Sequence, residues 1–203
     1  MVNMQKIAVI GCGFVGSTSA FSLIQTGLFS EMVLIDANKE RAEGEAMDLS
    51  HGSAYLTPMK IYAGTYDDIV DAGIIVITAG ANQKPNETRL DLVKKNVNIF
   101  KSIIPEITSR NCEGIILVVS NPVDILTEVT LKLSGFPANR VIGSGTVLDT
   151  ARLKYVLGRH LQVDPRNIHA YIIGEHGDSE LAVWSGKKKY GITIEETSKL
   201  KKG

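Results

Sequence analysis

Short apolar runs that alternate with helical stretches are the feature that most limits what this 203-residue chain can fold into. The apolar runs are residues 6–11, 32–36, 60–64, 73–80, 114–120 and 141–145. Stretches with the apolar spacing of helices lie between them, at residues 14–27, 39–50, 88–109 and 124–135. Strands that are apolar throughout are buried on both faces, so the pattern predicts an α/β fold: a doubly wound parallel sheet between helices.

The pattern changes after residue 145. A helix is predicted over residues 147–160 and a strand over 168–173, and a lysine-rich tail follows. We therefore predict a complete domain over residues 1–145 and the start of an α+β domain over 146–203.

Composition argues against several classes of partner. Lys plus Arg and Asp plus Glu each number 22, so no charge bias favours nucleic acid or a membrane surface. The apolar runs are too short to span a bilayer, and the amino-terminal residues show no signal sequence. Cys12 and Cys112 do not suggest a disulfide framework. We expect a cytoplasmic protein without nucleic-acid or membrane partners and without a metal site.

A glycine loop follows the first predicted strand. Gly11, Gly13 and Gly16 have the spacing G-x-G-x-x-G, and Asp36 ends the next strand. Such glycines allow a tight turn, close approach of a pyrophosphate to the helix amino terminus, and tight helix–strand packing. Asp36 suits the adenosine ribose hydroxyls and would repel a 2′-phosphate, so the loop predicts a Rossmann-type domain that binds NAD. The alternatives are a plain strand–helix turn and a solvated acid.

Four further segments carry polar residues in positions typical of sites. They are TAGANQKPNETRLDL (78–92), VSNPVD (119–124), LDTARLKY (148–155) and IIGEHGDSE (172–180). Taken singly, an Asp-x-x-Arg pair is usually a surface ion pair. A single histidine is likewise more often structural than catalytic. Together and in this order, the five motifs resemble the lactate/malate dehydrogenase family, most closely its bacterial L-lactate-forming members, from Lys6 through Trp184.

The resemblance implies reversible hydride transfer between NADH and pyruvate, giving L-lactate. His176 would be the acid–base group, and Asp149 would orient its ring. Arg152 would bind the substrate carboxylate through two hydrogen bonds, and Arg89 would polarise the carbonyl from a closing loop. Asn121 would bind near both the nicotinamide and the reacting oxygen.

The resemblance also implies a set of coenzyme contacts. They are Gly11, Gly13, Phe14, Val15, Gly16, Asp36, Thr78, Ala79, Gly80 and Asn121. Gln83 stands where malate enzymes carry arginine, which favours pyruvate over oxaloacetate. Malate or another 2-hydroxy acid remains the alternative substrate. The second domain of the family continues past the equivalent of Gly203, so a non-catalytic NAD-binding fragment is a further alternative.

A regulatory site is the last feature that the resemblance implies. Lys154 and His169 match positions at which many bacterial relatives bind fructose 1,6-bisphosphate between the subunits of a homotetramer. Lysine replaces the usual arginine, which loses the two-pronged contact with phosphate. The alternative is that both residues lie on solvated surfaces.

Overall fold

The computed structural model describes residues 1–82, 87–183, 188–189 and 192–193, and the chain forms two compact units, Met1–Gly143 and Ser144–Gly203. The strands of the first unit are β1 (Asn3–Ile10), β2 (Glu31–Ile35), β3 (Lys60–Ala63), β4 (Ala72–Ile77), β5 (Ile115–Val118) and β6 (Val141–Gly143). Its helices are α1 (Phe14–Ile24), α2 (Lys39–His51), α3 (Arg89–Thr108) and α4 (Val123–Ser134), with short 3-10 turns at Gly52–Tyr55, Tyr66–Ile69 and Ala138–Arg140.

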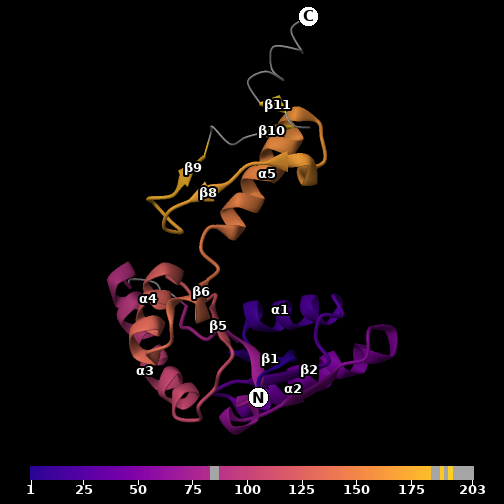
Figure 1. Cartoon of the computed structure of the whole chain (residues 1–203), viewed down its shortest axis with the longest axis vertical. Helices are drawn as coiled ribbons and strands as arrows, with labels where there is room; N and C mark the ends of the chain where they lie inside the picture. Colours follow the sequence, from indigo (N-terminus) through magenta and orange to yellow (C-terminus); the bar gives the residue numbers. More distant parts are fainter. Residues whose placement is uncertain (83–86, 184–187, 190–191, 194–203) are drawn as a thin grey trace, which may run out of the picture. The chain divides into compact units, whose positions relative to one another are not determined.

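The six strands form one parallel sheet in the order β3-β2-β1-β4-β5-β6. Strands β1, β2, β5 and β6 of this sheet are labelled in Figure 1. This order confirms the predicted Rossmann-type doubly wound fold. The strand order switches between β1 and β4: successive strands are added outward on one side from β1 to β3 and on the other side from β4 to β6. Ligands of such sheets bind at this switch point, outside the carboxyl ends of the strands.

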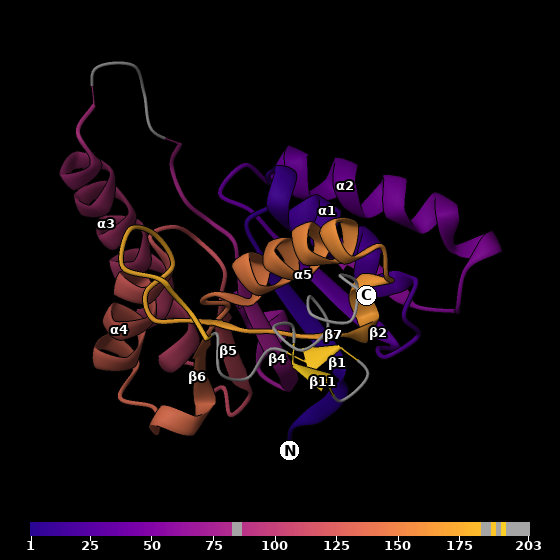
Figure 2. The same ribbon diagram turned by 90° about the horizontal axis from the view of Figure 1, so that it is seen from above.

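Helices cover both faces of the sheet. Helices α1 and α2 pack on one face, against a cluster that includes Val9, Met32 and Leu34. Helices α3 and α4 lie together on the other face (Figure 2), against a cluster that includes Ala8 and Ile75. Alternate residues of the same strand therefore enter opposite clusters, which explains why the strands are apolar throughout.

A charged cluster closes the amino-terminal end of the sheet. The Lys6 ammonium, 6% exposed as a residue, lies 2.8 Å from Asp71 and 3.2 Å from Glu31. Tyr62 also donates a hydrogen bond to Glu31, at 2.7 Å. Burial opposes the charged forms, but the hydrogen bonds outweigh it: they raise the pKa of Lys6 and lower the pKa of Glu31. Burial and the bond to Glu31 raise the pKa of Tyr62 to about 12.

The second unit contains one long helix and short strands. They are α5 (Val147–Leu161), β7 (Ile168–His169), β8 (Ile172–Ile173), β9 (Leu181–Ala182), β10 (Lys188–Lys189) and β11 (Ile192–Thr193), with a 3-10 turn at Pro165–Asn167. The prediction of a single strand over residues 168–173 is wrong. The chain makes two strands there because β7 pairs with β10 and β8 pairs with β9, so its two ends enter different sheets. None of the helices in the described residues is long and apolar enough to cross a membrane.

Candidate functional site

The glycine loop between β1 and α1 passes so close to neighbouring backbone that side chains cannot fit. Gly11 has φ +103°, and a Cβ added there would lie 2.5 Å from the Ala79 nitrogen. A Cβ added to Gly16 would lie 1.8 Å from the Gly11 oxygen. At Gly13 a Cβ would meet only open space. Two glycines thus serve close packing, and the third keeps the approach to the α1 amino terminus open.

Asp36 follows β2 and holds the loop from the side. Its Oδ2 accepts a hydrogen bond from the Cys12 backbone nitrogen at 2.7 Å, and its Oδ1 accepts one from the Asn38 nitrogen at 2.8 Å. Burial and the nearby Asp36 carboxylate raise the pKa of the Cys12 thiol to about 12, so Cys12 stays protonated. The Asp36 carboxylate, just after β2, is therefore held in place by hydrogen bonds to the backbone of the glycine loop and of Asn38.

Two adjacent cavities lie along the carboxyl ends of β1, β4 and β5. One has a volume of about 680 Å³, and its lining includes Gly11, Gly13, Asp36, Thr78, Ala79 and Gly80. The other, of about 290 Å³, is lined by Val15, Thr78, Gly80, Ala81, Asn82, Leu92, Asn96, Val119, Ser120 and Asn121. They share Thr78 and Gly80. Eight of the ten predicted coenzyme contacts line one cavity or the other, whereas Gly16 is buried against the loop and Phe14 is 93% exposed.

These cavities fit a dinucleotide. The lining of the first includes the Asp36 carboxylate and Gly13 at the amino terminus of α1, which are groups suited to a ribose and a pyrophosphate. The second shares Thr78 and Gly80 with the first, and its lining includes Asn121. Residues of this unit could therefore hold both halves of NAD.

Helix α3 has a well-defined amino terminus, with Thr88 as its N-cap residue. Thr88 and Asp91 form a capping box: the Thr88 hydroxyl accepts a hydrogen bond from the Asp91 backbone nitrogen at 3.2 Å, and the Asp91 carboxylate accepts one from the Thr88 backbone nitrogen at 3.2 Å. Arg89 is consequently the first residue of the helix, and its side chain is exposed. Glu87 forms an ion pair with Lys95, eight residues further along the chain. Gln83 lies outside the described residues.

In the second unit, a buried carboxylate meets a histidine and an arginine. Asp149, in the first turn of α5, is 6% exposed. Its Oδ2 lies 2.5 Å from Nδ1 of His176, and its Oδ1 accepts a hydrogen bond from Arg152 at 3.2 Å. The Arg152 side chain is 64% exposed and that of His176 is 25% exposed. The structure thus brings together three residues predicted from two separate motifs.

The histidine is carried by the turn between β8 and β9. Two threonines at the start of α5 fix this hairpin. Thr146, the N-cap residue, donates to the Ile172 oxygen at 2.6 Å, and the hydroxyl of Thr150 in the helix accepts from the Ile172 nitrogen at 3.0 Å. Gly177, beside His176, has φ +144°, a conformation that an L side chain would strain. The turn therefore depends on glycine next to the histidine.

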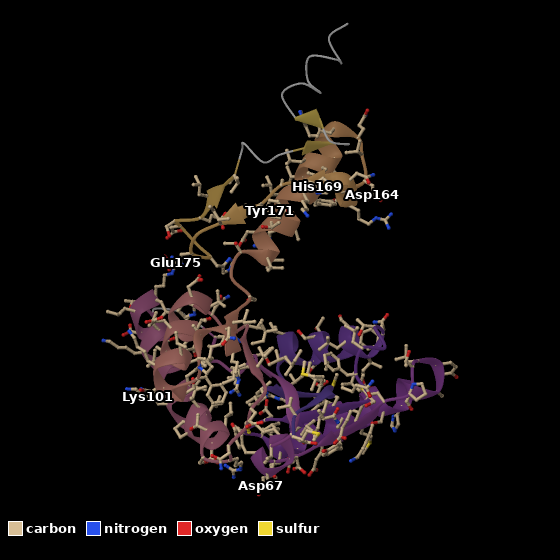
Figure 3. All side chains as sticks on the ribbon, viewed as in Figure 1. Asp67, Lys101, Asp164, His169, Tyr171 and Glu175 are labelled. Atoms are coloured by element: carbon tan, nitrogen blue, oxygen red, sulfur yellow. The ribbon has the colours of Figure 1, made fainter. Side chains whose placement is uncertain are left out.

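Lys154 and His169 lie in the same unit. The Lys154 ammonium is 5.6 Å from the centroid of the Tyr171 ring, and His169 is exposed on β7 (Figure 3). Both side chains are available to an anion at the surface.

Three polar residues of these sites were not singled out by the sequence. Ser120 donates to the Ala79 oxygen at 2.7 Å, and Asn96 is a buried residue of the second cavity. Glu180 offers an oxygen within 4.8 Å of ligand atoms of both Asp149 and His176. Of these three residues, Asn96 left a signal in the sequence, because a polar residue there interrupts the apolar stripe of α3.

Chemically, the Asp149 carboxylate beside Nδ1 selects one tautomer of the imidazole. A histidine held this way can exchange a proton, and an adjacent guanidinium can bind a carboxylate. The first unit offers a dinucleotide cradle.

Comparisons with known proteins agree. Residues 5–143 match the NAD binding domain of lactate/malate dehydrogenases, and residues 146–203 match their alpha/beta C-terminal domain. L-lactate dehydrogenase 1 of Clostridium acetobutylicum is 60% identical over 97% of the chain and 63% of its own length. L-lactate dehydrogenase of Priestia megaterium is 60% identical over 94% of the chain and 60% of its own length.

A solved structure gives the same result. The minor L-lactate dehydrogenase of Enterococcus mundtii is 48% identical, with a TM-score of 0.92, over 95% of this chain and 62% of that one. The chain spans about three fifths of the length of these relatives. The family models cover nearly all of the chain, and the relatives share its sequence at high identity. The chain belongs to the lactate/malate dehydrogenase family.

Proposed function

We propose that the protein acts as an NAD-dependent L-lactate dehydrogenase, which reduces pyruvate with NADH and runs in reverse with L-lactate. The observation that carries the proposal is the buried Asp149 carboxylate, bonded to both His176 and Arg152. Relatives that are about 60% identical are named L-lactate dehydrogenases, which supports the reaction class. Residues 1–145 would form the NAD-binding domain, and residues 146–203 would form part of the catalytic domain.

Each side chain has a role in the proposed reaction. Residues that line the two cavities of the first unit would hold NAD, which would supply the hydride to pyruvate or accept it from lactate. His176 gives a proton to the carbonyl oxygen of pyruvate and removes it from the hydroxyl of lactate. Asp149 keeps the ring in the required tautomer. Arg152 holds the substrate carboxylate, and Arg89 and Asn121 stabilise the charge that develops on the oxygen.

Asp36 determines the choice of coenzyme in this proposal. Its carboxylate accepts from the ribose hydroxyls and repels a 2′-phosphate. Fluorescence titration should therefore show much tighter binding of NADH than of NADPH. Similar dissociation constants for the two coenzymes would contradict the role of Asp36.

Gln83 determines the choice of substrate in this proposal. A neutral amide accepts the methyl group of pyruvate, whereas the second carboxylate of oxaloacetate needs a cation. Gln83→Arg should shift the ratio of kcat/KM values toward oxaloacetate. An unchanged ratio would favour another 2-hydroxy acid or another specificity residue.

The central experiment measures pyruvate-dependent NADH oxidation by the purified chain, with NADH titration in parallel. Turnover with pyruvate supports the dehydrogenase. NADH binding without turnover of pyruvate, oxaloacetate or longer 2-keto acids supports the alternative, an NAD-binding module. The two results separate the functions because coenzyme binding needs only residues of the first unit.

Regulation and assembly complete the proposal. A cytoplasmic homotetramer would bind fructose 1,6-bisphosphate through Lys154, whose ammonium lies over the Tyr171 ring, and His169, which is exposed on β7. The anion would relieve repulsion between like charges of neighbouring subunits and favour assembly. Sedimentation and the KM for pyruvate, measured with the sugar at pH 6 and pH 8, test this. No response at pH 6 would eliminate the site.

A further inference from the structure

A buried asparagine on α3 connects the two loops that wall the second cavity. Asn96 is 2% exposed. Its Oδ1 accepts a hydrogen bond from the Ala81 backbone nitrogen at 2.8 Å, and its Nδ2 donates one to the Asn121 backbone oxygen at 2.7 Å. Ala81 lies beyond β4 and Asn121 lies beyond β5. One side chain therefore joins loops that follow two neighbouring strands.

The chemistry of its partners fixes the orientation of the amide. Ala81 offers only an N–H donor to it, and Asn121 offers only a carbonyl acceptor. A rotation by 180° would place two donors together and two acceptors together. Both ends of the side chain are thus used in a single arrangement.

Packing alone does not account for an asparagine at this position. The buried face of α3 consists of Asn96, Phe100, Ile103, Ile104 and Ile107, so an apolar residue would continue the stripe. Asparagine is a poorer helix former than leucine, and burying its amide costs free energy unless both ends are bonded. The residue therefore indicates a requirement of the loops rather than of the core.

Both loops contribute to the cavity in which the proposed reaction would take place. Ala81 and Asn121 both line the second cavity, and the proposed function gives Asn121 a contact with the reacting oxygen. Ser120 adds a bond between the same loops through its hydroxyl and the Ala79 oxygen. Asn96 differs from Ser120 because it ties both loops to the helix that carries Arg89.

We propose that Asn96 is a positioning residue for the dehydrogenase reaction. Its amide sets the spacing between the Ala81 and Asn121 backbones, and through them the placement of the Asn121 side chain relative to α3, which begins at Arg89. Asn96 contacts neither substrate nor coenzyme in this role. The inference rests on the proposed function, because the loops matter only if Arg89 and Asn121 act on the substrate.

Two variants separate the two bonds. Asn96→Asp keeps an oxygen that accepts from Ala81 but replaces the donor to Asn121 with an oxygen, so two acceptors face each other. Asn96→Ala removes both bonds. Asn98→Ala is the matched control, since Asn98 is exposed on the same helix two residues away.

Hydrogen exchange of the Ala81 amide, followed by NMR, reports on the clamp without any need for turnover. It should be slow in the wild type and in Asn96→Asp, and faster in Asn96→Ala. In the pyruvate assay, kcat should fall by about 10- to 100-fold in both variants, as for a misplacement of order 1 Å. Asn98→Ala should match the wild type in both measurements.

A pH profile distinguishes positioning from a general loss of stability. In Asn96→Asp, protonation of the introduced carboxyl group restores a donor for the Asn121 oxygen. Its kcat, relative to the wild type at the same pH, should therefore rise between pH 8 and pH 5.5. That of Asn96→Ala should not. Because Asn96→Asp preserves side-chain volume, it still decides the matter if the alanine variant does not fold.

The outcomes separate this inference from the function on which it rests. Unchanged Ala81 exchange in Asn96→Ala overturns the clamp. Wild-type kcat in both variants overturns the positioning role. A wild-type chain that binds NADH but never oxidises it with a 2-keto acid overturns the proposed function instead, and Ala81 exchange then still decides whether the clamp exists.

Discussion

In the first unit the glycine loop contributes space to the cavity wall, whereas in the second unit the candidate chemistry lies on three side chains. The glycine loop is fixed by a six-stranded sheet with two large apolar clusters. Asp149 and His176 are fixed by one helix and a hairpin of two-residue strands. Binding thus depends on where the backbone can pass, and proton transfer depends on individual functional groups.

This difference predicts how substitutions should behave. In the first unit, adding a single methyl group should be enough to damage function, because space is what the loop provides. In the second unit, removing a functional group should abolish chemistry while the coenzyme still binds.

The largest expected effect is that of His176→Ala. Losing the acid–base group should lower kcat by about 10²- to 10⁴-fold, with the NADH dissociation constant nearly unchanged. His160→Ala is the matched control, since His160 is exposed near the end of α5. Steady-state kinetics and NADH titration check both variants. A His176→Ala enzyme with normal kcat would contradict the assignment.

Two glycines of one loop should respond differently to the same change. In Gly16→Ala the new methyl group meets the Gly11 oxygen, so the loop must shift, and both Tm and NADH affinity should fall. In Gly13→Ala the methyl group enters open space, so Tm should hold while NADH binds about tenfold or more weakly, because the pyrophosphate loses its approach. Calorimetry and fluorescence titration measure the two quantities. Equal losses of Tm would show that Gly13 is structural too.

The contrast also explains what the sequence could predict. Strand positions in the first unit followed from apolar runs, since burial on both faces leaves a local pattern. The strand predicted over 168–173 was wrong because its pairing partners lie elsewhere in the chain. The contact between Asp149 and His176, 27 residues apart, was predicted only through the family resemblance. Asn96 was missed because its two partners come from separate loops.

The charged cluster at the base of the sheet should make stability depend on pH. Glu31, with its lowered pKa, contributes stability that is present above its ordinary pKa of 4.5 and is lost as the pH falls. Lys6, with its raised pKa, contributes stability that is present below 10.5 and is lost as the pH rises through its higher folded value. Unfolding free energy should therefore decline at both extremes.

Lys6→Met tests this cluster. It should cost about 1–3 kcal/mol at pH 7, because the partly buried carboxylates lose a partner, and it should flatten the alkaline decline. Lys101→Met, at an exposed position of α3 (Figure 3), should change neither quantity. Urea unfolding at several pH values gives the free energies. Parallel pH curves for Lys6→Met and the wild type would contradict the assigned linkage.

The smallest effects concern a helical glycine in each unit. Gly44 is exposed in the middle of α2, and a Cβ there meets nothing within 4 Å, so Gly44→Ala should raise the unfolding free energy by about 0.5–1 kcal/mol.

Gly158 in α5 is buried, and a Cβ there would lie 2.9 Å from the Val163 oxygen and 3.1 Å from Pro165. Gly158→Ala should therefore be destabilising, since the turn after α5 has to move and the helix-propensity gain is smaller than that cost. Amide hydrogen exchange, read separately for each unit, should confine each change to the unit that carries it. If Gly158→Ala slowed exchange in α5 as Gly44→Ala does in α2, close packing would not be what requires glycine in the second unit.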